Sequence, residues 1–176
     1  MSDFAANTLS GLIGALLGSG AAYWLTRQSQ KVTFAFDLHK EFNTIEMGKH
    51  RHTAEELIKK HPTLTFKQLG EKDTDSMDSL YVIIRFYQRL GLAVKYAQVH
   101  KKLVRDMFDT NFYYWYYGSF KPGFIDLNEN GSEHLEYLLI WFYRRISLSR
   151  HKALRFQSEQ WLINIKSKGD SSPQGT

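Results

Sequence analysis

The sequence predicts an all-α protein in which a single N-terminal transmembrane helix precedes a cytoplasmic helical bundle. Two observations predict this fold class. Residues 4–25 contain no charged side chain, and from residue 27 onward apolar residues recur at the three- and four-residue spacing of amphipathic helices. With 176 residues, of which 43% are hydrophobic and 23% charged, the chain has the size and composition of one globular domain plus an appendage.

The uncharged N-terminal segment has the length of a membrane span. As a helix, residues 4–25 extend about 33 Å, against a hydrocarbon core of roughly 30 Å. Tyr23 and Trp24 stand at its end, where amphipathic rings favour the headgroup layer. The alternative, a cleaved signal peptide, has basic residues before its apolar core, whereas only Met-Ser-Asp precedes this segment. The sequence therefore favours a retained anchor.

Flanking charges predict the orientation of this anchor. One acid, Asp3, precedes it, whereas Arg27, Lys31 and Lys40 follow it within about 15 residues, the distance over which basic charge is counted. The positive-inside rule then places residues 1–3 outside, residues 4–25 in the membrane and residues 26–166 in the cytoplasm as a helical domain. Residues 167–176 are expected to form a disordered polar tail.

Small residues follow two neighbouring rows of the predicted span. At four-residue spacing, small side chains let helix backbones approach closely, which drives association in lipid. Two rows suit contacts with two neighbours, and therefore a ring rather than a pair. The alternative is that they only lower the hydropathy of a solitary anchor. The first row is Ser10, Gly14, Gly18 and Ala22, and the second is Gly11, Ala15 and Ser19.

Apolar spacing and turn residues divide the cytoplasmic part into helices. Phe34, Leu38 and Phe42 predict that the anchor continues as a long helix, although the alternation at residues 32–36 is also compatible with a short strand. The remaining predicted elements, in order, are a helix over 45–60 ended by His61-Pro62, a linker over 62–75, a helix from Asp75 or Ser76 to Gly91, one long or two abutting helices over 92–120, turns at 121–123 and 128–131, a helix from Ser132, and a helix through 154–165.

The composition excludes several kinds of site. The absence of Cys excludes disulfides, thiolate zinc sites, iron–sulfur clusters and a cysteine nucleophile. No HExxH, Walker or nucleotide-binding glycine motif occurs. His50 and His52 diverge by about 200° on a helix and therefore do not share a metal. The sequence predicts no metal and no cofactor.

Charge and aromatic content leave RNA binding open. The formal net charge of +5 is compatible with nucleic acid, with anionic lipid or with an ordinary solvated surface. Residues 112–117, FYYWYY, favour core and interface packing, with base stacking as the alternative.

One short motif suggests chemistry. Arg144 and Arg145 precede His151 by six and five intervening residues, a spacing that resembles the Arg-x4–6-His motif of the HEPN superfamily. Histidine accepting a 2′-hydroxyl proton and arginine stabilising phosphorane charge would suffice for metal-independent RNA cleavage. Active members carry Asn, Asp or His after the arginine, whereas Ile146 follows Arg145. The resemblance thus favours an HEPN-like domain without enzymatic activity.

The combined architecture resembles a more specific family. A small-residue-rich span, a basic all-α domain and a divergent Arg-x5-His are similar to the small membrane accessory proteins encoded beside the RNA-guided RNase effector of type VI-B CRISPR systems. The resemblance covers residues 1–166 and implies a bacterial inner-membrane protein that assembles into a pore and strengthens antiviral interference by depolarising the membrane. It also implies functional coupling to the effector.

Three functional hypotheses follow from the sequence. The first is a membrane effector that forms a homo-oligomeric ring in lipid. The second is a membrane-tethered, metal-independent HEPN ribonuclease that uses Arg145 and His151. The third is a passive tether that binds a partner or RNA through its basic surface.

Overall fold

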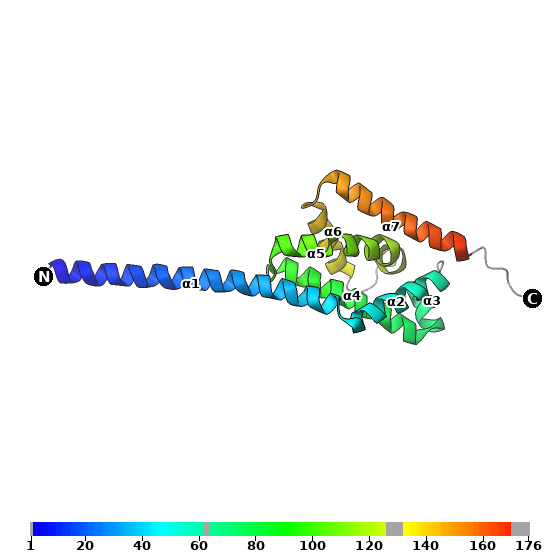
Figure 1. The fold of residues 1–176 in the computed structure, drawn as a ribbon, viewed down its shortest axis with the longest axis horizontal. Coiled ribbons are helices and arrows are strands. Elements are labelled where there is room, and N and C mark those ends of the chain that lie inside the picture. Colours follow the sequence, from blue (N-terminus) through cyan, green and yellow to red (C-terminus); the bar gives the residue numbers. More distant parts are fainter. Residues whose placement is uncertain (1, 62–63, 126–131, 170–176) are drawn as a thin grey trace, which may run out of the picture.

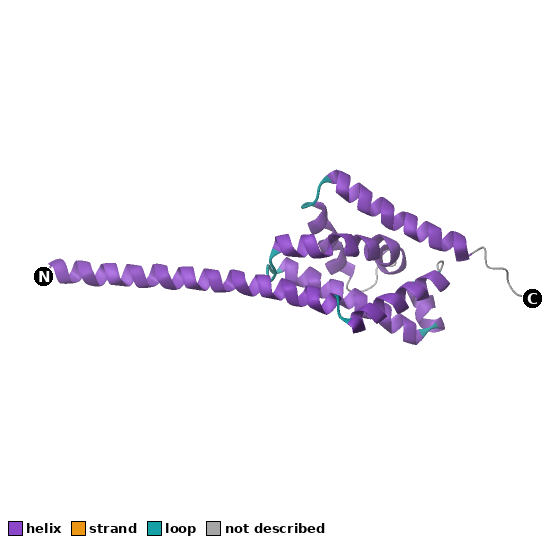
Figure 2. Ribbon diagram, viewed as in Figure 1, coloured by secondary structure: helices purple, strands orange, loops and turns teal. Residues whose placement is uncertain are grey.

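The computed structural model describes residues 2–61, 64–125 and 132–169. The side chains of residues 1–13, 124–125, 162 and 165–169 lie outside this description, and with them Ser10 and Gly11 of the two small-residue rows and residues 4–13 of the predicted span. All regular elements in the described ranges are helical, which confirms the all-α prediction (Figure 2). They are α1 (Ser2–Phe42), α2 (Ile45–Lys60), α3 (Phe66–Lys72), α4 (Thr74–Lys95), α5 (Lys101–Trp115), the π-helix η1 (Tyr116–Ile125), α6 (Ser132–Tyr143) and α7 (Leu148–Gly169).

The molecule consists of a helical body and a stalk. Helix α1 projects from the body for more than half of its length, and its C-terminal part packs beside α5 and α2 (Figure 1). Ala35, Leu38 and Phe42 are buried there. The prediction of one long helix is therefore confirmed, and residues 32–36 form part of it rather than a strand. Among the residues searched, no helix combines the length and the apolar character required to cross a bilayer.

The core of the body is an aromatic cluster around α4. Phe86 and Tyr87 of α4 lie between Phe42 of α1 and two rings of α5, Phe108 and Phe112. Ring centroids are 5.0 Å apart for Phe42 and Phe86 and 5.3 Å apart for Tyr87 and Phe112, the separations at which edge-to-face and tilted pairs are favourable. Burial of α1 in this cluster fixes the base of the stalk.

The predicted linker over residues 62–75 contains a helix. Thr65 opens α3 with a capping box, in which the Thr65 hydroxyl accepts from the Gln68 amide while the Gln68 side chain accepts from the Thr65 amide. Asp73 then ends α3 through its amide and begins α4 by accepting from the Ser76 amide at 3.1 Å. Residues 62–63 lie outside the described residues.

Two glycines do not end helices as the sequence suggests. Helix α4 runs through Gly91 to Lys95. The glycine at this position serves a close approach to α6 rather than a helix end, since a Cβ there would be 2.5 Å from the His134 carbonyl oxygen. The predicted end at Gly91 is thus wrong. Gly123 of the predicted turn at 121–123 belongs to η1, where its Cα lies against the Phe66 ring. The predicted turn at 128–131 falls outside the described residues.

The aromatic run at residues 112–117 packs inside the body. Phe112 and Tyr113 are fully buried and Tyr117 is 8% exposed. Six consecutive rings point all round a helix, and α7 also packs against this run, with the Trp161 ring tilted against Tyr114 at a centroid distance of 4.5 Å. The structure therefore confirms the packing interpretation. Helix α7 continues to Gly169, three residues into the predicted tail, whose residues 170–176 lie outside the described residues.

Candidate functional site

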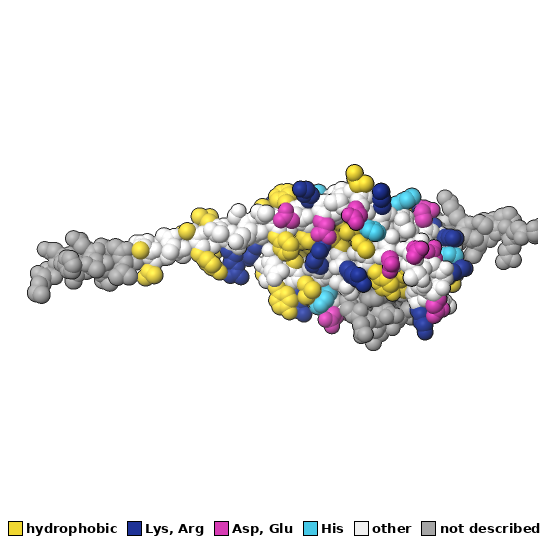
Figure 3. Space-filling view, turned by 90° about the horizontal axis from the view of Figure 1, so that it is seen from below, with side chains coloured by type: hydrophobic (Ala, Val, Ile, Leu, Met, Phe, Trp, Pro, Cys, Tyr) yellow, Lys and Arg dark blue, Asp and Glu magenta, His cyan; other side chains and the backbone are white. Residues whose placement is uncertain are grey.

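The stalk carries the first candidate site. From Gly14 to Thr26 it has no charged side chain, and every side chain in that stretch is exposed, with Leu17 70% and Trp24 59% accessible. Apart from neighbouring residues and the backbone of the same helix, no atom lies within 4 Å of a Cβ built on Gly14 or Gly18. Figure 3 shows this part of the stalk without Lys, Arg, Asp or Glu colouring. Contiguous uncharged surface of this kind marks an interaction site for lipid or for another protein.

Two described hydroxyl groups of the stalk, those of Ser19 and Thr26, are satisfied within the helix. Ser19 donates to the Leu16 carbonyl at 3.0 Å, and Thr26 donates to the Ala22 carbonyl at 2.8 Å. In a medium without water an unpaired hydroxyl costs several kcal/mol, about 4–8 on the cyclohexane scale, and back-bonding to the helix removes most of that cost. The polar residues of the stalk are thus compatible with a bilayer.

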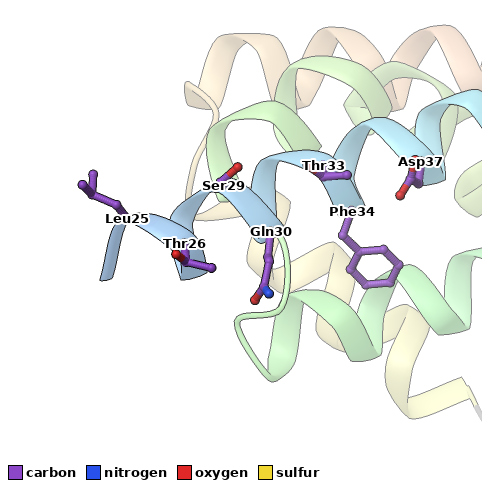
Figure 4. A pocket seen from close by; sticks show the side chains of 7 residues that line it. All are labelled: Leu25, Thr26, Ser29, Gln30, Thr33, Phe34 and Asp37. Atoms are coloured by element: carbon purple, nitrogen blue, oxygen red, sulfur yellow. The ribbon is translucent and has the colours of Figure 1, made fainter. Parts of the chain in front are cut away.

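A shallow groove continues along α1 toward the body. Its volume is about 520 Å³, and its walls come from α1 alone, as Figure 4 shows. The groove begins at the end of the uncharged stretch and ends beside the body. Its lining residues are Leu25, Thr26, Ser29, Gln30, Thr33, Phe34 and Asp37.

The second candidate site is a polar pocket of about 240 Å³ where the α6–α7 turn meets α5. Arg145, the arginine of the predicted motif, is one of its lining residues. The Arg145 guanidinium lies 4.6 Å from the Trp141 ring centroid and donates to the Trp141 carbonyl at 3.4 Å. The other lining residues are Arg105, Asp106, Asp109, Ile146, Ser147 and Arg150.

Two ion pairs involve four of the five charged side chains that line this pocket. The Asp109 carboxylate is buried, accepts from Arg150 at 2.7 Å and also accepts from the Thr110 amide at 2.6 Å. Arg105 pairs with Asp106 at 2.8 Å. A buried carboxylate with its partners in place fixes the α6–α7 turn on α5, because a lone buried charge would be costly.

His151 lies outside this pocket. It is 9% exposed, and its Nδ1 atom is hydrogen bonded to the Tyr113 hydroxyl at 2.6 Å. Its ring packs edge-on against Tyr143, with centroids 4.5 Å apart. Burial lowers the pKa of His151, and the positive charge of Arg155 lowers it further.

The two halves of the predicted motif therefore have different surroundings. The structure brings Arg145 together with Arg105 and Arg150, and it brings His151 together with aromatic rings of the core. Arg144 is exposed on the turn. Sequence reasoning missed Asp109, whose only local signal is its four-residue spacing from Arg105.

The other histidines do not assemble into a metal site. Among the residues that the structure describes, no group of three or more His, Asp or Glu side chains is placed to hold an ion. His50 instead pairs with the Ser79 hydroxyl at 3.1 Å, and His39 packs edge-on against Phe108.

Comparisons with protein-family models, curated proteins and solved structures found no match to this chain.

Proposed function

We propose that this protein is a membrane-anchored, self-associating effector whose α1 helix crosses the bilayer. One observation carries the proposal: a helix continuous with the core leaves the body uncharged and uncovered on every side over residues 14–26. An isolated helix in water gains little from its own hydrogen bonds, and most helical stability comes from burying a face. Lipid and neighbouring copies of the stalk supply that burial.

The ends of the uncharged stretch support a bilayer. Tyr23 and Trp24 suit the headgroup layer, and Arg27 and Lys31 follow on the side of the body. This arrangement favours a cytoplasmic body at the bacterial inner membrane, with the N-terminus outside.

The small-residue rows support association between copies. Gly14 and Gly18 offer backbone surface with nothing within 4 Å, so a second helix has room to approach closely. The resemblance to accessory proteins of type VI-B CRISPR systems extends the proposal. Several copies would form a ring around a pore, and its opening would depolarise the membrane and strengthen interference by an RNA-guided RNase effector.

Substitution on the two faces of the stalk tests the proposal. Gly14→Leu with Gly18→Leu should reduce the oligomer in nanodiscs, measured by subunit photobleaching, and abolish membrane depolarisation and phage protection. Gly20→Leu is the matched control, because Gly20 is equally open but lies about 200° from Gly18 around the helix. Normal assembly and protection by the Gly14/Gly18 variant would contradict the mechanism.

A swap of the anchor separates an effector from a passive tether. Replacing residues 1–26 with an unrelated transmembrane helix preserves insertion and should abolish protection if the stalk itself assembles. Full protection by the swapped protein would favour the tether.

The ribonuclease alternative has less support from the geometry. A general base must reach the 2′-hydroxyl, whereas the His151 ring is packed against Tyr113 and Tyr143. Metal-independent cleavage of single-stranded RNA by the full chain, lost in His151→Ala, would restore this alternative.

A further inference from the structure

Lysines from two helices line one pocket where the stalk joins the body. The pocket has a volume of about 400 Å³ and contains no acidic side chain in its lining, unlike the groove on α1 and the Arg145 pocket. Three lysines that line one cavity without an acidic neighbour in the lining create a positive field that a bound anion relieves. The lining residues are Gln28 and Lys31 of α1, Ala97, Val99 and His100 of the α4–α5 connection, and Lys101 and Lys102 of α5.

The N-terminus of α5 also lies at this pocket, because His100, Lys101 and Lys102 are among its lining residues. His100 is the N-cap of α5, and its side chain makes no capping hydrogen bond, so it does not occupy the first-turn amides of α5. Its Nδ1 atom is buried without a partner. The N-terminal amides of a 15-residue helix favour an anion electrostatically.

The pocket is held rigidly against the stalk. The His100 amide donates to the Lys31 carbonyl at 3.1 Å, which ties the α4–α5 connection to α1. Ala97, with φ 53°, ends α4 in a Schellman arrangement, in which the Gln98 amide reaches the Ala93 carbonyl at 2.9 Å. The backbone positions from which the three lysines project are therefore fixed relative to one another.

The pocket lies at the level where lipid phosphates are expected. Lys31 follows Thr26, the last uncharged residue before Arg27, by five positions, about 7.5 Å along the helix. The polar layer of a bilayer extends roughly 5–8 Å beyond its hydrocarbon core on each side. Figure 3 shows Lys and Arg side chains at the junction of stalk and body.

We propose that this pocket binds the phosphate group of an anionic phospholipid headgroup. The inference rests on the proposed membrane anchor, which brings the pocket to the headgroup layer. Lys31, Lys101 and Lys102 neutralise the phosphate, and the first-turn amides of α5 donate hydrogen bonds to its oxygens. The bound lipid fixes the height and tilt of the body on the membrane.

Binding of short-chain lipid to the full chain in maltoside detergent tests the inference. Calorimetric titration with dihexanoyl-phosphatidylglycerol should show saturable binding at least about tenfold tighter than with dihexanoyl-phosphatidylcholine, because the choline cation cancels the phosphate charge. The variant K31Q/K101Q/K102Q should lose at least about tenfold in affinity for phosphatidylglycerol. The control K60Q/K67Q/K72Q removes the same charge from α2 and α3, at the far end of the body (Figure 1), and should bind as the wild type does.

Three results would overturn the inference. Equal losses in the two triple variants would show non-specific charge attraction. Equal affinities for the two lipids would remove the preference for net negative charge. Displacement of phosphatidylglycerol by an equal concentration of inorganic phosphate would identify a soluble phosphate site. Extraction of membranes at alkaline pH measures separately whether the protein is inserted in the bilayer. The variant K31Q/K101Q/K102Q should stay inserted, so a loss of lipid binding at the pocket is distinguishable from a loss of membrane anchoring.

Discussion

Tyr113→Phe measures what the buried His151 contributes to the fold. The substitution removes one hydroxyl and leaves the ring in place, so it removes the 2.6 Å hydrogen bond to His151 Nδ1 without creating a large cavity. The change in the free energy of unfolding therefore reports on this hydrogen bond. Tyr113 is fully buried and His151 is 9% exposed, so water does not replace the lost partner. An unsatisfied buried group costs about 1–3 kcal/mol.

The expected result is a lower melting temperature. For a chain of this size 1 kcal/mol corresponds to roughly 2–4 °C, so a cost of about 1–3 kcal/mol should lower the melting temperature by about 2–12 °C. The assay is thermal unfolding of the full chain in detergent, followed by circular dichroism. Tyr96→Phe is the control, because Tyr96 is 62% exposed and its hydroxyl has no buried partner to abandon.

A double-mutant cycle tests whether the effect of Tyr113→Phe comes from its hydrogen bond to His151. In a His151→Ala background the Tyr113 hydroxyl has lost its partner, so Tyr113→Phe should cost little there. If Tyr113→Phe melts within a degree of the wild type, or costs as much with His151 absent as with it present, the hydrogen bond does not hold the α5–α7 contact. A large loss would explain a phenotype of His151→Ala without catalysis.

Three further predictions concern pH and backbone geometry. Burial and the neighbouring Arg155 lower the pKa of His151, so His151 takes up a proton at higher pH in the unfolded chain than in the folded one. The folded state should therefore keep its full stability above about pH 6.5 and lose stability as the pH falls through the folded pKa. In thermal melts between about pH 7.5 and 5, His151→Gln should show a smaller loss of stability than the wild type. Gly91→Ala should destabilise by about 1–3 kcal/mol in urea titration, since its Cβ meets the α6 backbone, whereas Gly70→Ala, with its nearest atom at 3.8 Å, should be neutral or stabilising by up to about 1 kcal/mol; equal effects would contradict the contact. Ala97→Gly should stabilise by up to about 1 kcal/mol by relieving positive φ, and a lower melting temperature would contradict this.

Local signals were sufficient for the long helices. The three- and four-residue spacing of apolar residues predicted α1 beyond the uncharged segment, and Ser132 predicted the start of α6. Helix α3 was missed because seven residues are too few for periodicity, although Thr65 and Gln68 carry the spacing of a capping box. Gly91 misled the prediction, since a tight contact between helices is a tertiary property that a lone glycine does not reveal.

For the candidate sites, too, the sequence predicted local patterns but not contacts between residues that are distant in the chain. The sequence revealed the uncharged stretch and the spacing of Arg145 and His151. It did not reveal that Arg145 shares a pocket with Asp109 while His151 contacts Tyr113, because both of these partners lie about 40 residues away on α5. Lys31 and Lys101 meet only through the folding of the body onto α1.

The phase of α1 relates the small-residue rows to the body. Residues 21–42 contain no Gly or Pro, so the stalk and its buried base form one uninterrupted helix. At about 100° per residue, the two small-residue rows taken together point roughly 140° away from the side on which Ala35, Leu38 and Phe42 enter the core. The groove on α1 follows the side of the rows. In the proposed assembly, neighbouring stalks would meet along the rows with each body on the outer side of its own helix, an arrangement that would leave the centre of a ring to the stalks and the lysine pocket facing lipid.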